Sequence, residues 1–322
     1  MKVNTNLQAQ QFQPKQILRT GQIIQGEISK LYPHNKAQIQ LGNEVFVANL
    51  ETALNAGEKY YFQVKIANNM VYLKVISKSI KDKSKSSISN LFENLGITVS
   101  KERISFVAEL IQKGIPFDKK QLMNAVPFAD LIKKEPEIQN ILEEMILRKL
   151  PINRTVFESI YTYKTNDQST LMREMLRQID LIGEANSEIH KMFQELISKS
   201  ISAQPKNAFL HLVHKYLTTS GLDYENQLAK GELPQQNLKV MLLTIFKKNV
   251  NSEVKILGEK LLHYMNGMKI ASVDNLDSYL HIHFKIPGTG LGLTQDIELH
   301  FESRKKENNE IDPDYCRILL FL

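Results

Sequence analysis

The sequence predicts a multidomain α+β protein with a small β-barrel, a helical middle and a short β-rich end. Apolar and polar residues alternate in five short runs between Gly21 and Ile76, which is typical of strands. From Ile88 to about Met265 apolar residues recur with the helical period, and beyond Gly267 strict alternation returns. The boundaries that follow are a tail over 1–13, a five-stranded barrel of the OB or SH3 type over 14–80, a basic linker over 81–90, a helical domain over 91–268 and a β-rich domain over 269–322.

The five N-terminal runs predict a closed antiparallel barrel. Gly42 and Asn43 join the second and third runs, Asn68 and Asn69 join the last two, and short Gly/Asn loops of this kind are strong hairpin signals. Five strands in about 60 residues match a small OB-like or SH3-like barrel, whose closure removes unpaired strand edges. This fold serves many functions, so the barrel alone specifies none.

Composition excludes several classes of protein. The chain has 322 residues, 42% of them hydrophobic, which is enough for two or three domains with real cores. It has no run of the roughly 18–20 apolar residues that span a bilayer and no N-terminal signal core, so we expect a cytoplasmic protein without membrane insertion. Its single cysteine, Cys316, excludes an internal disulfide framework and a thiolate zinc site.

The positive charge of the chain lies at its N-terminal end. Residues 1–90 contain 12 Lys and Arg against 5 Asp and Glu, a balance of +7, whereas the other residues contain 29 against 30, a balance of −1. A basic lobe beside a neutral body suggests an acidic partner for the barrel. The alternative is that lysines on edges and linkers keep a small β domain in solution.

Local signals around the barrel predict disorder and helix starts. Residues 1–13 are polar and rich in Asn and Gln, so we expect a disordered tail, and the lysines and serines of Ser77–Ser87 predict a flexible linker. In the helical domain Ser100, Asp118 and Asn153 each follow an apolar pair that brackets a turn residue. We expect these three residues to be N-caps with a structural rather than a catalytic role.

The last part of the chain predicts strands. Alternation over Tyr279–Ile286 and Asp296–Phe301 and an apolar run over Arg317–Leu322 are typical of a small sheet. Since a domain does not usually end on an unpaired apolar strand, we expect the chain to be a fragment or a truncated product.

No constellation of residues predicts catalysis or a cofactor. The loop from Gly288 to Gly292 lacks the third glycine and the following helix of a dinucleotide site, and a strand follows it, so we expect a hairpin loop. No Ser-His-Asp order with a nucleophile elbow is present. We therefore predict that the protein is not an enzyme and uses no cofactor.

Two groups of histidines are candidates for a metal site. His211 and His214 are three residues apart on a predicted helix, but no carboxylate or thiol within a turn completes a site. His281, His283 and His300 lie on two neighbouring predicted strands and can converge, although histidines facing water are common on sheet surfaces. The sequence therefore predicts no metal site.

Four barrel residues are candidates for a nucleic-acid site. Alternation places Tyr61 and Lys65 opposite the core positions of one strand, and Tyr72 and Lys74 opposite those of the next. Exposed tyrosines and lysines on adjacent strands stack bases and neutralise phosphates in single-strand-binding barrels. The alternative is that tyrosine is a good strand former and that lysine protects strand edges.

Several passages of the sequence are similar to those of a known family. They are Gly26-Glu27-Ile28 through Gln40-Leu41-Gly42 with Leu50–Glu58, then Leu95-Gly96-Ile97 with Lys113-Gly114-Ile115-Pro116, and Asp296–Leu299 through Ile311–Ile318. With a tail, a barrel, a helical body and a short β domain in this order, the chain resembles the flagellar hook-length control (FliK-like) proteins of Gram-positive bacteria, in particular a Bacillus-type group. Pro287, Leu291 and Gly292 match the Pro…Leu-Gly pattern of that family's C-terminal domain, but the long Pro- and Gln-rich ruler is absent.

The resemblance implies a non-enzymatic interaction protein of the type III export system. It implies that the tail enters an export channel and that the C-terminal domain contacts an export-gate component, with Pro287, Leu291 and Gly292 at the interface. Two alternatives stay open: a single-stranded nucleic-acid-binding protein that uses the four barrel residues, and a structural adaptor whose helical body docks another helix.

Overall fold

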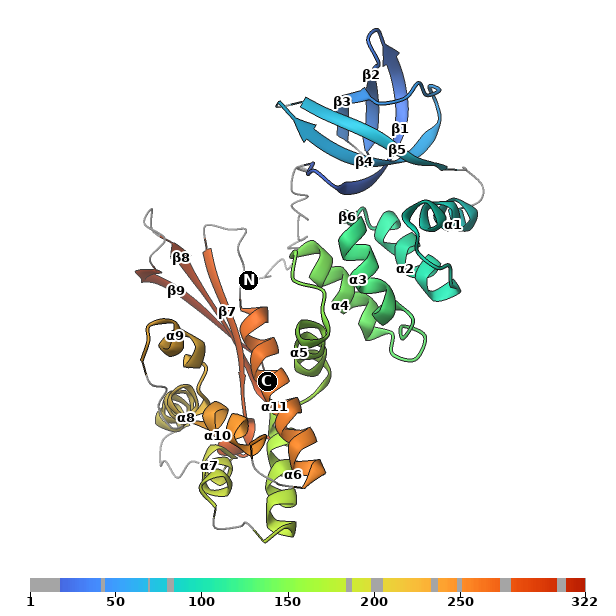
Figure 1. Cartoon of the computed structure of the whole chain (residues 1–322). Coiled ribbons are helices and arrows are strands. Elements are labelled where there is room, and N and C mark those ends of the chain that lie inside the picture. The colour runs from blue at the N-terminus through green and yellow to red at the C-terminus, as the bar shows by residue number, and fades with distance from the viewer. Residues whose placement is uncertain are drawn as a thin grey trace, which may run out of the picture. The chain divides into compact units, whose positions relative to one another are not determined.

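The computed structural model divides the chain into two units, residues 1–152 and 153–322 (Figure 1). It describes residues 18–41, 44–68, 70–79, 84–183, 187–197, 205–232, 237–247, 251–272, 279–305 and 311–321. The predicted disordered tail over 1–13, the turn residues Gly42, Asn43 and Asn69, and Leu322 lie outside the described residues.

The first unit begins with a closed five-stranded barrel. Its strands are β1 (Gln22–Tyr32), β2 (Lys36–Leu41), β3 (Glu44–Leu50), β4 (Lys59–Ala67) and β5 (Met70–Ser79). They follow the order β2-β3-β5-β4-β1, and β1 also pairs with β2, which closes the barrel. β3 and β5 run parallel, and the other neighbours run antiparallel. This closed Greek-key order is that of an OB fold, so the predicted barrel is confirmed.

Strand β1 closes the barrel because it bends and serves two partners. Residues Ile23–Glu27 pair with β4, Glu27–Tyr32 pair with β2, and the register shifts between Ile28 and Lys30. At Gly26, before the bend, an added Cβ would lie 2.6 Å from Cγ2 of Ile39, so the approach of β1 to β2 requires glycine there. The buried core that the five strands enclose consists of Leu18, Ile24, Ile28, Ala37, Ile39, Leu41, Ala48, Leu50, Tyr60, Phe62, Val64 and Leu73.

Glu58, just before β4, connects β4 to β5 through its carboxylate. Lys78 and Tyr60 donate hydrogen bonds to this carboxylate. The bond from Lys78 has the largest effect and the bond from Tyr60 the next largest, and together they lower the pKa of Glu58 to about 2. A group with a lowered folded-state pKa stabilises the folded protein above its unfolded pKa and loses this effect as the pH falls toward the folded value.

We expect the Glu58 carboxyl to titrate in the folded protein near pH 2, and the titration midpoint to rise in Lys78→Met because that variant removes the main donor. Carboxyl ¹³C NMR against pH measures both midpoints. The same midpoint in the wild type and in Lys78→Met would contradict the prediction.

Four helices and a short strand complete the first unit. They are α1 (Ser84–Leu95), α2 (Lys101–Gln112), β6 (Phe117–Asp118), α3 (Lys119–Ala129) and α4 (Glu137–Leu147). The prediction of a flexible linker through Ser87 is wrong from Ser84 onward. Ile88, Leu91 and Phe92 are buried on one side of α1, and burial of this apolar stripe outweighs the weak helix preference of the serines. β6, which the sequence did not predict, pairs with Gln22 and Ile23 of β1.

The three predicted N-caps are confirmed. The side chain of Ser100 accepts a hydrogen bond from the backbone N of Arg103 at 3.2 Å, and that of Asn153 accepts from Val156 at 3.0 Å. Asp118 forms a capping box with Gln121, in which each side chain accepts from the backbone of the other. These bonds satisfy amides that the helices leave without an internal partner.

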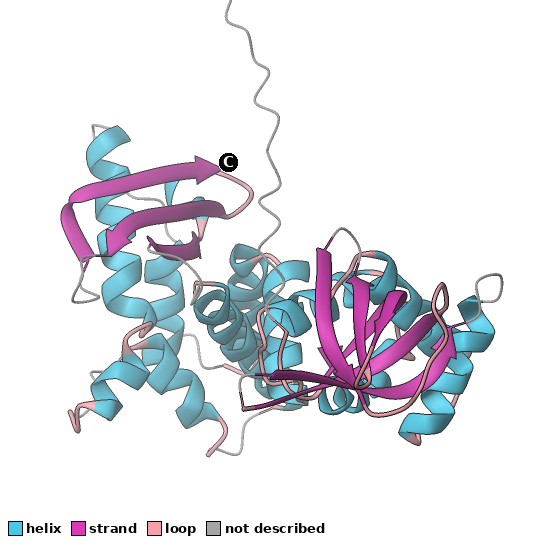
Figure 2. Ribbon diagram, turned by 90° about the horizontal axis from the view of Figure 1, so that it is seen from above, coloured by secondary structure: helices cyan, strands magenta, loops and turns pink. Residues whose placement is uncertain are grey.

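In the part of the second unit that the structure describes, helices pack against a three-stranded antiparallel sheet (Figure 2). The helices are α5 (Arg154–Thr165), α6 (Gln168–Leu181), α7 (Glu188–Ile197), α8 (Pro205–Ser220), α9 (Tyr224–Ala229), α10 (Leu238–Ile245) and α11 (Ser252–Ala271). The sheet has the order β7 (Tyr279–Ile286), β8 (Ile297–Lys305), β9 (Ile311–Phe321), and the short helix η1 (Gly288–Leu291) connects β7 to β8.

The sheet and helices of the second unit share one core. Phe284 and Ile286 of β7 and Ile297 and Leu299 of β8 are buried in the same cluster as Met172, Tyr216 and Leu261 from the helices. The expected separate β-rich domain over 269–322 is therefore part of a larger unit. The expected helical domain over 91–268 is divided at residues 152/153, because α1–α4 belong with the barrel and α5–α11 with the sheet.

Candidate functional site

A row of tyrosines and lysines crosses the outer surface of the barrel from strand to strand. Tyr32 is the partner of Lys36, Lys36 of Asn49, Asn49 of Tyr72, and Tyr72 of Lys65. Strand partners project from the same face of a sheet, with Cβ atoms about 4.5–5.5 Å apart. We call these five residues the barrel row.

The members of the barrel row are accessible from outside. Lys36 and Lys65 are exposed, and Tyr32, Asn49 and Tyr72 are partly exposed. The Tyr32 hydroxyl donates a 2.9 Å hydrogen bond to Oε1 of Gln38, which fixes this ring on the outer face of the barrel. The row therefore combines two aromatic rings, which can stack on bases, with two ammonium groups, which can neutralise phosphates.

Three of the four residues predicted for nucleic-acid binding lie at this surface. Lys65 and Tyr72 face each other across β4 and β5, and Lys74 is exposed two residues further along β5. The prediction that Tyr61 faces water is wrong, because only 2% of this residue is exposed. Its hydroxyl accepts a 3.3 Å hydrogen bond from Nε2 of Gln25, and the buried ring is not available to stack on a base.

Tyr61 does point away from the barrel core, as its position in β4 predicts. It is absent from the core cluster that contains its neighbours Tyr60 and Phe62. Its strand partner Ser77 is also buried, and α1 and β6 contact the strands on either side. The later part of the first unit thus covers this end of β4, and only the other end of β4, at Lys65, remains open.

Sequence reasoning missed Tyr32, Lys36 and Asn49 of the barrel row. The sequence contained a signal for Lys36 and Asn49, because a two-residue loop fixes the register of the two strands that it joins. Lys36 precedes Gly42 by as many residues as Asn49 follows Asn43, so the two residues are strand partners. Val45 and Val47 on the outer side of β3 were missed too. They are 55% and 60% exposed and add apolar surface beside the row.

The loop predicted to contact an export gate is mainly structural. Pro287 is buried, and Leu291 packs against the core of the second unit. Gly292 is exposed and ends η1 with a φ of 79°, a left-handed conformation that favours glycine. The loop connects the antiparallel strands β7 and β8, as the sequence predicted.

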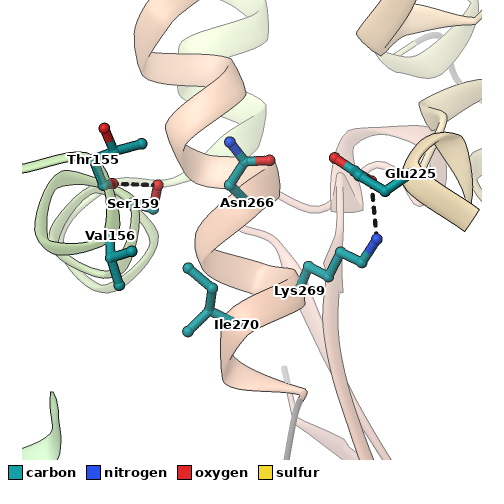
Figure 3. Close-up of a pocket in the computed structure, with 7 residues that line it drawn as sticks. All are labelled: Thr155, Val156, Ser159, Glu225, Asn266, Lys269 and Ile270. Atoms are coloured by element: carbon teal, nitrogen blue, oxygen red, sulfur yellow. Dashed lines mark hydrogen bonds and ion pairs between the residues drawn. The ribbon is translucent and has the colours of Figure 1, made fainter. Parts of the chain in front are cut away.

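A pocket of about 240 Å³ lies between α5, α9 and α11 of the second unit (Figure 3). Its lining residues are Thr155, Val156, Ser159, Glu225, Asn266, Lys269 and Ile270. Glu225 accepts a 2.9 Å hydrogen bond from Lys269 and another from Lys239. Burial opposes ionisation of Glu225, but these two lysines lower its pKa on balance. The carboxylate is therefore negatively charged, and the two lysines balance its charge.

Ser159, in the wall of this pocket, contacts His263, which in turn contacts Glu158. The Ser159 hydroxyl donates to the carbonyl of Thr155 at 2.8 Å, so its oxygen is the acceptor toward Nδ1 of His263 at 3.2 Å. Nε2 of His263 lies 3.2 Å from Oε2 of Glu158. A nucleophilic serine needs the reverse polarity, with its hydrogen directed at the imidazole. The arrangement joins α5 to α11.

The histidines considered as metal ligands lie in different surroundings. His211 and His214 are both exposed on α8. On the sheet, His283 is the strand partner of His300, whereas His281 is the partner of Glu302. The structure thus brings His283 and His300 together and leaves His281 two residue pairs away along β7.

Comparison with known proteins identifies only the barrel. Residues 2–74 match the family model described as the TP0910 S1-like domain. No curated protein and no solved structure matches the chain. The N-terminal barrel is therefore S1-like, an OB-type barrel, and nothing in the comparisons points to hook-length control or type III export. Among the described helices, none combines the length and the apolar character needed to cross a bilayer.

Proposed function

We propose that the barrel binds single-stranded nucleic acid across the barrel row. The observation that carries this proposal is the continuous register of Tyr32, Lys36, Asn49, Tyr72 and Lys65 over five strands. Tyrosine rings stack on bases of any sequence, while lysines follow the phosphates. OB barrels use the face around their second and third strands for oligonucleotides, and two members of the row, Lys36 and Asn49, lie on β2 and β3.

The charge distribution supports the same site. The 12 basic and 5 acidic side chains of residues 1–90 give the barrel and its flanks a balance of +7, whereas the rest of the chain is close to neutral. A local positive field raises the rate at which a polyanion arrives and makes binding strongly dependent on salt. The similarity of residues 2–74 to an S1-like domain supports an OB-type binding surface in the same part of the chain.

The function we propose is binding without catalysis. Contact with an export gate through Pro287, Leu291 and Gly292 rests on the resemblance alone. Of these three residues, Pro287 is buried and Leu291 packs against the core of the second unit. The cytoplasmic location and export through a flagellar apparatus stay predictions. A protein partner on the barrel would use the apolar Val45 and Val47. The salt dependence of the affinity distinguishes the two kinds of partner, because binding to nucleic acid weakens steeply as the salt concentration rises.

We expect the full chain to bind a fluorescein-labelled 12-nucleotide oligo-U in an anisotropy titration. Tyr72→Ala should weaken binding about fivefold or more, because one stacked base contributes ~1–3 kcal/mol. Lys65→Ala should reduce the slope of log K against log salt concentration by about 0.7, the contribution of one phosphate on a single strand.

Matched variants control for nonspecific effects. Tyr72→Phe keeps the ring and should bind as the wild type does, and Lys134→Ala removes an exposed lysine of the same unit away from the barrel row. Undetectable binding at low salt would refute the proposal. Binding that Tyr72→Ala and Lys134→Ala weaken equally would refute the assigned site.

A further inference from the structure

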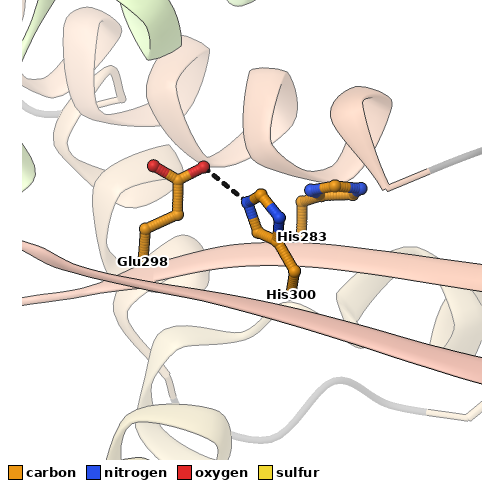
Figure 4. Close-up of side chains that lie close together, drawn as sticks. All are labelled: His283, Glu298 and His300. Atoms are coloured by element: carbon orange, nitrogen blue, oxygen red, sulfur yellow. Dashed lines mark hydrogen bonds and ion pairs between the residues drawn. The ribbon is translucent and has the colours of Figure 1, made fainter. Parts of the chain in front are cut away.

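Two imidazoles and a carboxylate converge on one face of the sheet in the second unit (Figure 4). His283 of β7 is the strand partner of His300 of β8, and Glu298 lies two residues before His300. Residues two apart project from the same face, so all three side chains lie opposite the buried Phe284 and Leu299. The sheet register thus assembles a cluster that no spacing within one strand reveals.

The distances within this cluster suit a shared ligand. Nε2 of His300 lies 2.7 Å from Oε1 of Glu298, and the centroids of the His283 and His300 rings are 4.0 Å apart. One ligand atom from each of the three residues lies within 4.8 Å of the others. Ligand atoms around a tetrahedral ion with bonds near 2.0–2.1 Å are about 3.3 Å apart, so small side-chain rotations bring all three into range.

The backbone that carries these ligands is fixed. β7 is an edge strand, and Ser272 after α11 binds its edge: the hydroxyl accepts from the N of His283 at 3.0 Å and donates to its carbonyl at 2.6 Å. The Sδ of Met268 accepts from the N of Lys285 at 3.2 Å. Ligands on a rigid strand pair hold their geometry before an ion arrives, which favours binding.

Neighbouring side chains hold the ligands in place. Nζ of Lys285 lies 3.7 Å from Oε2 of Glu298, while Oε1 of Glu298 faces Nε2 of His300. The Phe321 ring lies 4.8 Å from that of His300.

We propose that His283, Glu298 and His300 bind one divalent transition-metal ion of the zinc class. Two imidazoles and one carboxylate suit Zn²⁺ and its neighbours, whereas Mg²⁺ and Ca²⁺ prefer oxygen ligands alone. Three protein ligands leave the fourth position of a tetrahedral ion to water or to a group from a bound molecule. This site is independent of the nucleic-acid surface, which lies in the other unit.

The test is titration of the metal-stripped full chain with Zn²⁺ by calorimetry, and with Co²⁺ by visible absorption. We expect one ion per chain and a Co²⁺ spectrum of tetrahedral intensity. His283→Ala and His300→Ala should each weaken Zn²⁺ binding at least tenfold, because even the partners of metal ligands contribute about 10- to 100-fold. The double variant His211→Ala/His214→Ala, which removes two exposed histidines from α8, should bind as the wild type does.

Two further variants test which side chains of the sheet bind the ion. His281→Ala removes the histidine two residue pairs away along β7 and should leave the affinity unchanged. Glu298→Gln keeps the size of the side chain but should weaken binding about tenfold or more. Circular dichroism of each variant without metal shows whether it folds. If either histidine variant fails to fold, Glu298→Gln decides the question. Absence of stoichiometric Zn²⁺ binding to the wild type, or full affinity in Glu298→Gln, would overturn the proposal.

Discussion

Replacing Gly267 by alanine is expected to destabilise the second unit by about 3 kcal/mol, the upper end of the usual cost of overpacking a core. Gly267 lies on α11 where this helix crosses α5. A Cβ at Gly267 would overlap the carbonyl oxygen of Ser159 and lie 2.6 Å from Cβ of Tyr163. The obstacle is mainly backbone rather than the end of a flexible side chain, so relief requires the two helices to separate.

Gly258 on the same helix provides the matched control. A Cβ there would meet its nearest neighbours, the ends of the Phe246, Met175 and Leu242 side chains, at 3.6–3.9 Å, which is ordinary contact. Gly258→Ala should therefore stabilise the unit by up to ~1 kcal/mol, because alanine loses less conformational entropy in a helix than glycine.

The measurement must resolve the second unit, because a chain of two units need not unfold in a single step. Hydrogen exchange followed by mass spectrometry on peptides from α5 and α11 gives the local opening free energies directly. Opposite signs for the two substitutions would support the close helix crossing. Equal changes in both variants would contradict it.

The sequence predicted those features that depend on residues close together in the chain. The alternation in β1–β5 and the caps at Ser100, Asp118 and Asn153 are local, and the structure confirms them. The burial of Tyr61 is different. Its position in β4 places it outside the barrel core, but segments that follow β5 cover it, and alternation gives no information about such a cover.

The two candidate sites depend on strand register, which the sequence specifies only in part. Lys65 and Tyr72 belong to one hairpin, and the spacing about their turn suffices to pair them. Tyr32 joins the barrel row only because β1 bends, and the shift between Ile28 and Lys30 decides which of its residues face outward. Glu298 reaches His283 through the pairing of β7 with β8 across a ten-residue connection that gives no register signal of its own.

Asp296 shows the same kind of long-range dependence. It lies just before β8, yet its carboxylate occupies the N-terminus of α6. It accepts hydrogen bonds from the backbone N of Gln168 at 2.6 Å and of Ser169 at 3.0 Å. The Ser169 hydroxyl donates to it at 2.6 Å and the Tyr264 hydroxyl at 3.2 Å. One side chain thus connects α6, α11 and the start of the sheet.

Asp296→Ala is expected to cost about 3 kcal/mol, because it leaves several buried donors without an acceptor at once. Asp296→Asn keeps one acceptor oxygen and should cost less. Glu174→Ala on the same helix removes a partly exposed acid paired with Arg177 and should change stability little. Hydrogen exchange in peptides from α6 and β8 compares the three variants. A cost of Asp296→Ala no larger than that of Glu174→Ala would contradict the connecting role.

The pH dependence of this effect has a definite sign. Burial raises the pKa of Asp296 above its ordinary value of 3.8, and the nearby charge of Asp167 adds to the shift. A carboxyl with a raised folded-state pKa takes up its proton first in the folded protein, so the folded state gains stability as the pH falls through that pKa. Asparagine at this position does not titrate. The stability of the wild type relative to Asp296→Asn should therefore increase as the pH is lowered from 7 toward about 4. A constant or decreasing difference in stability over that range would show that the hydrogen-bond donors around Asp296 outweigh its burial.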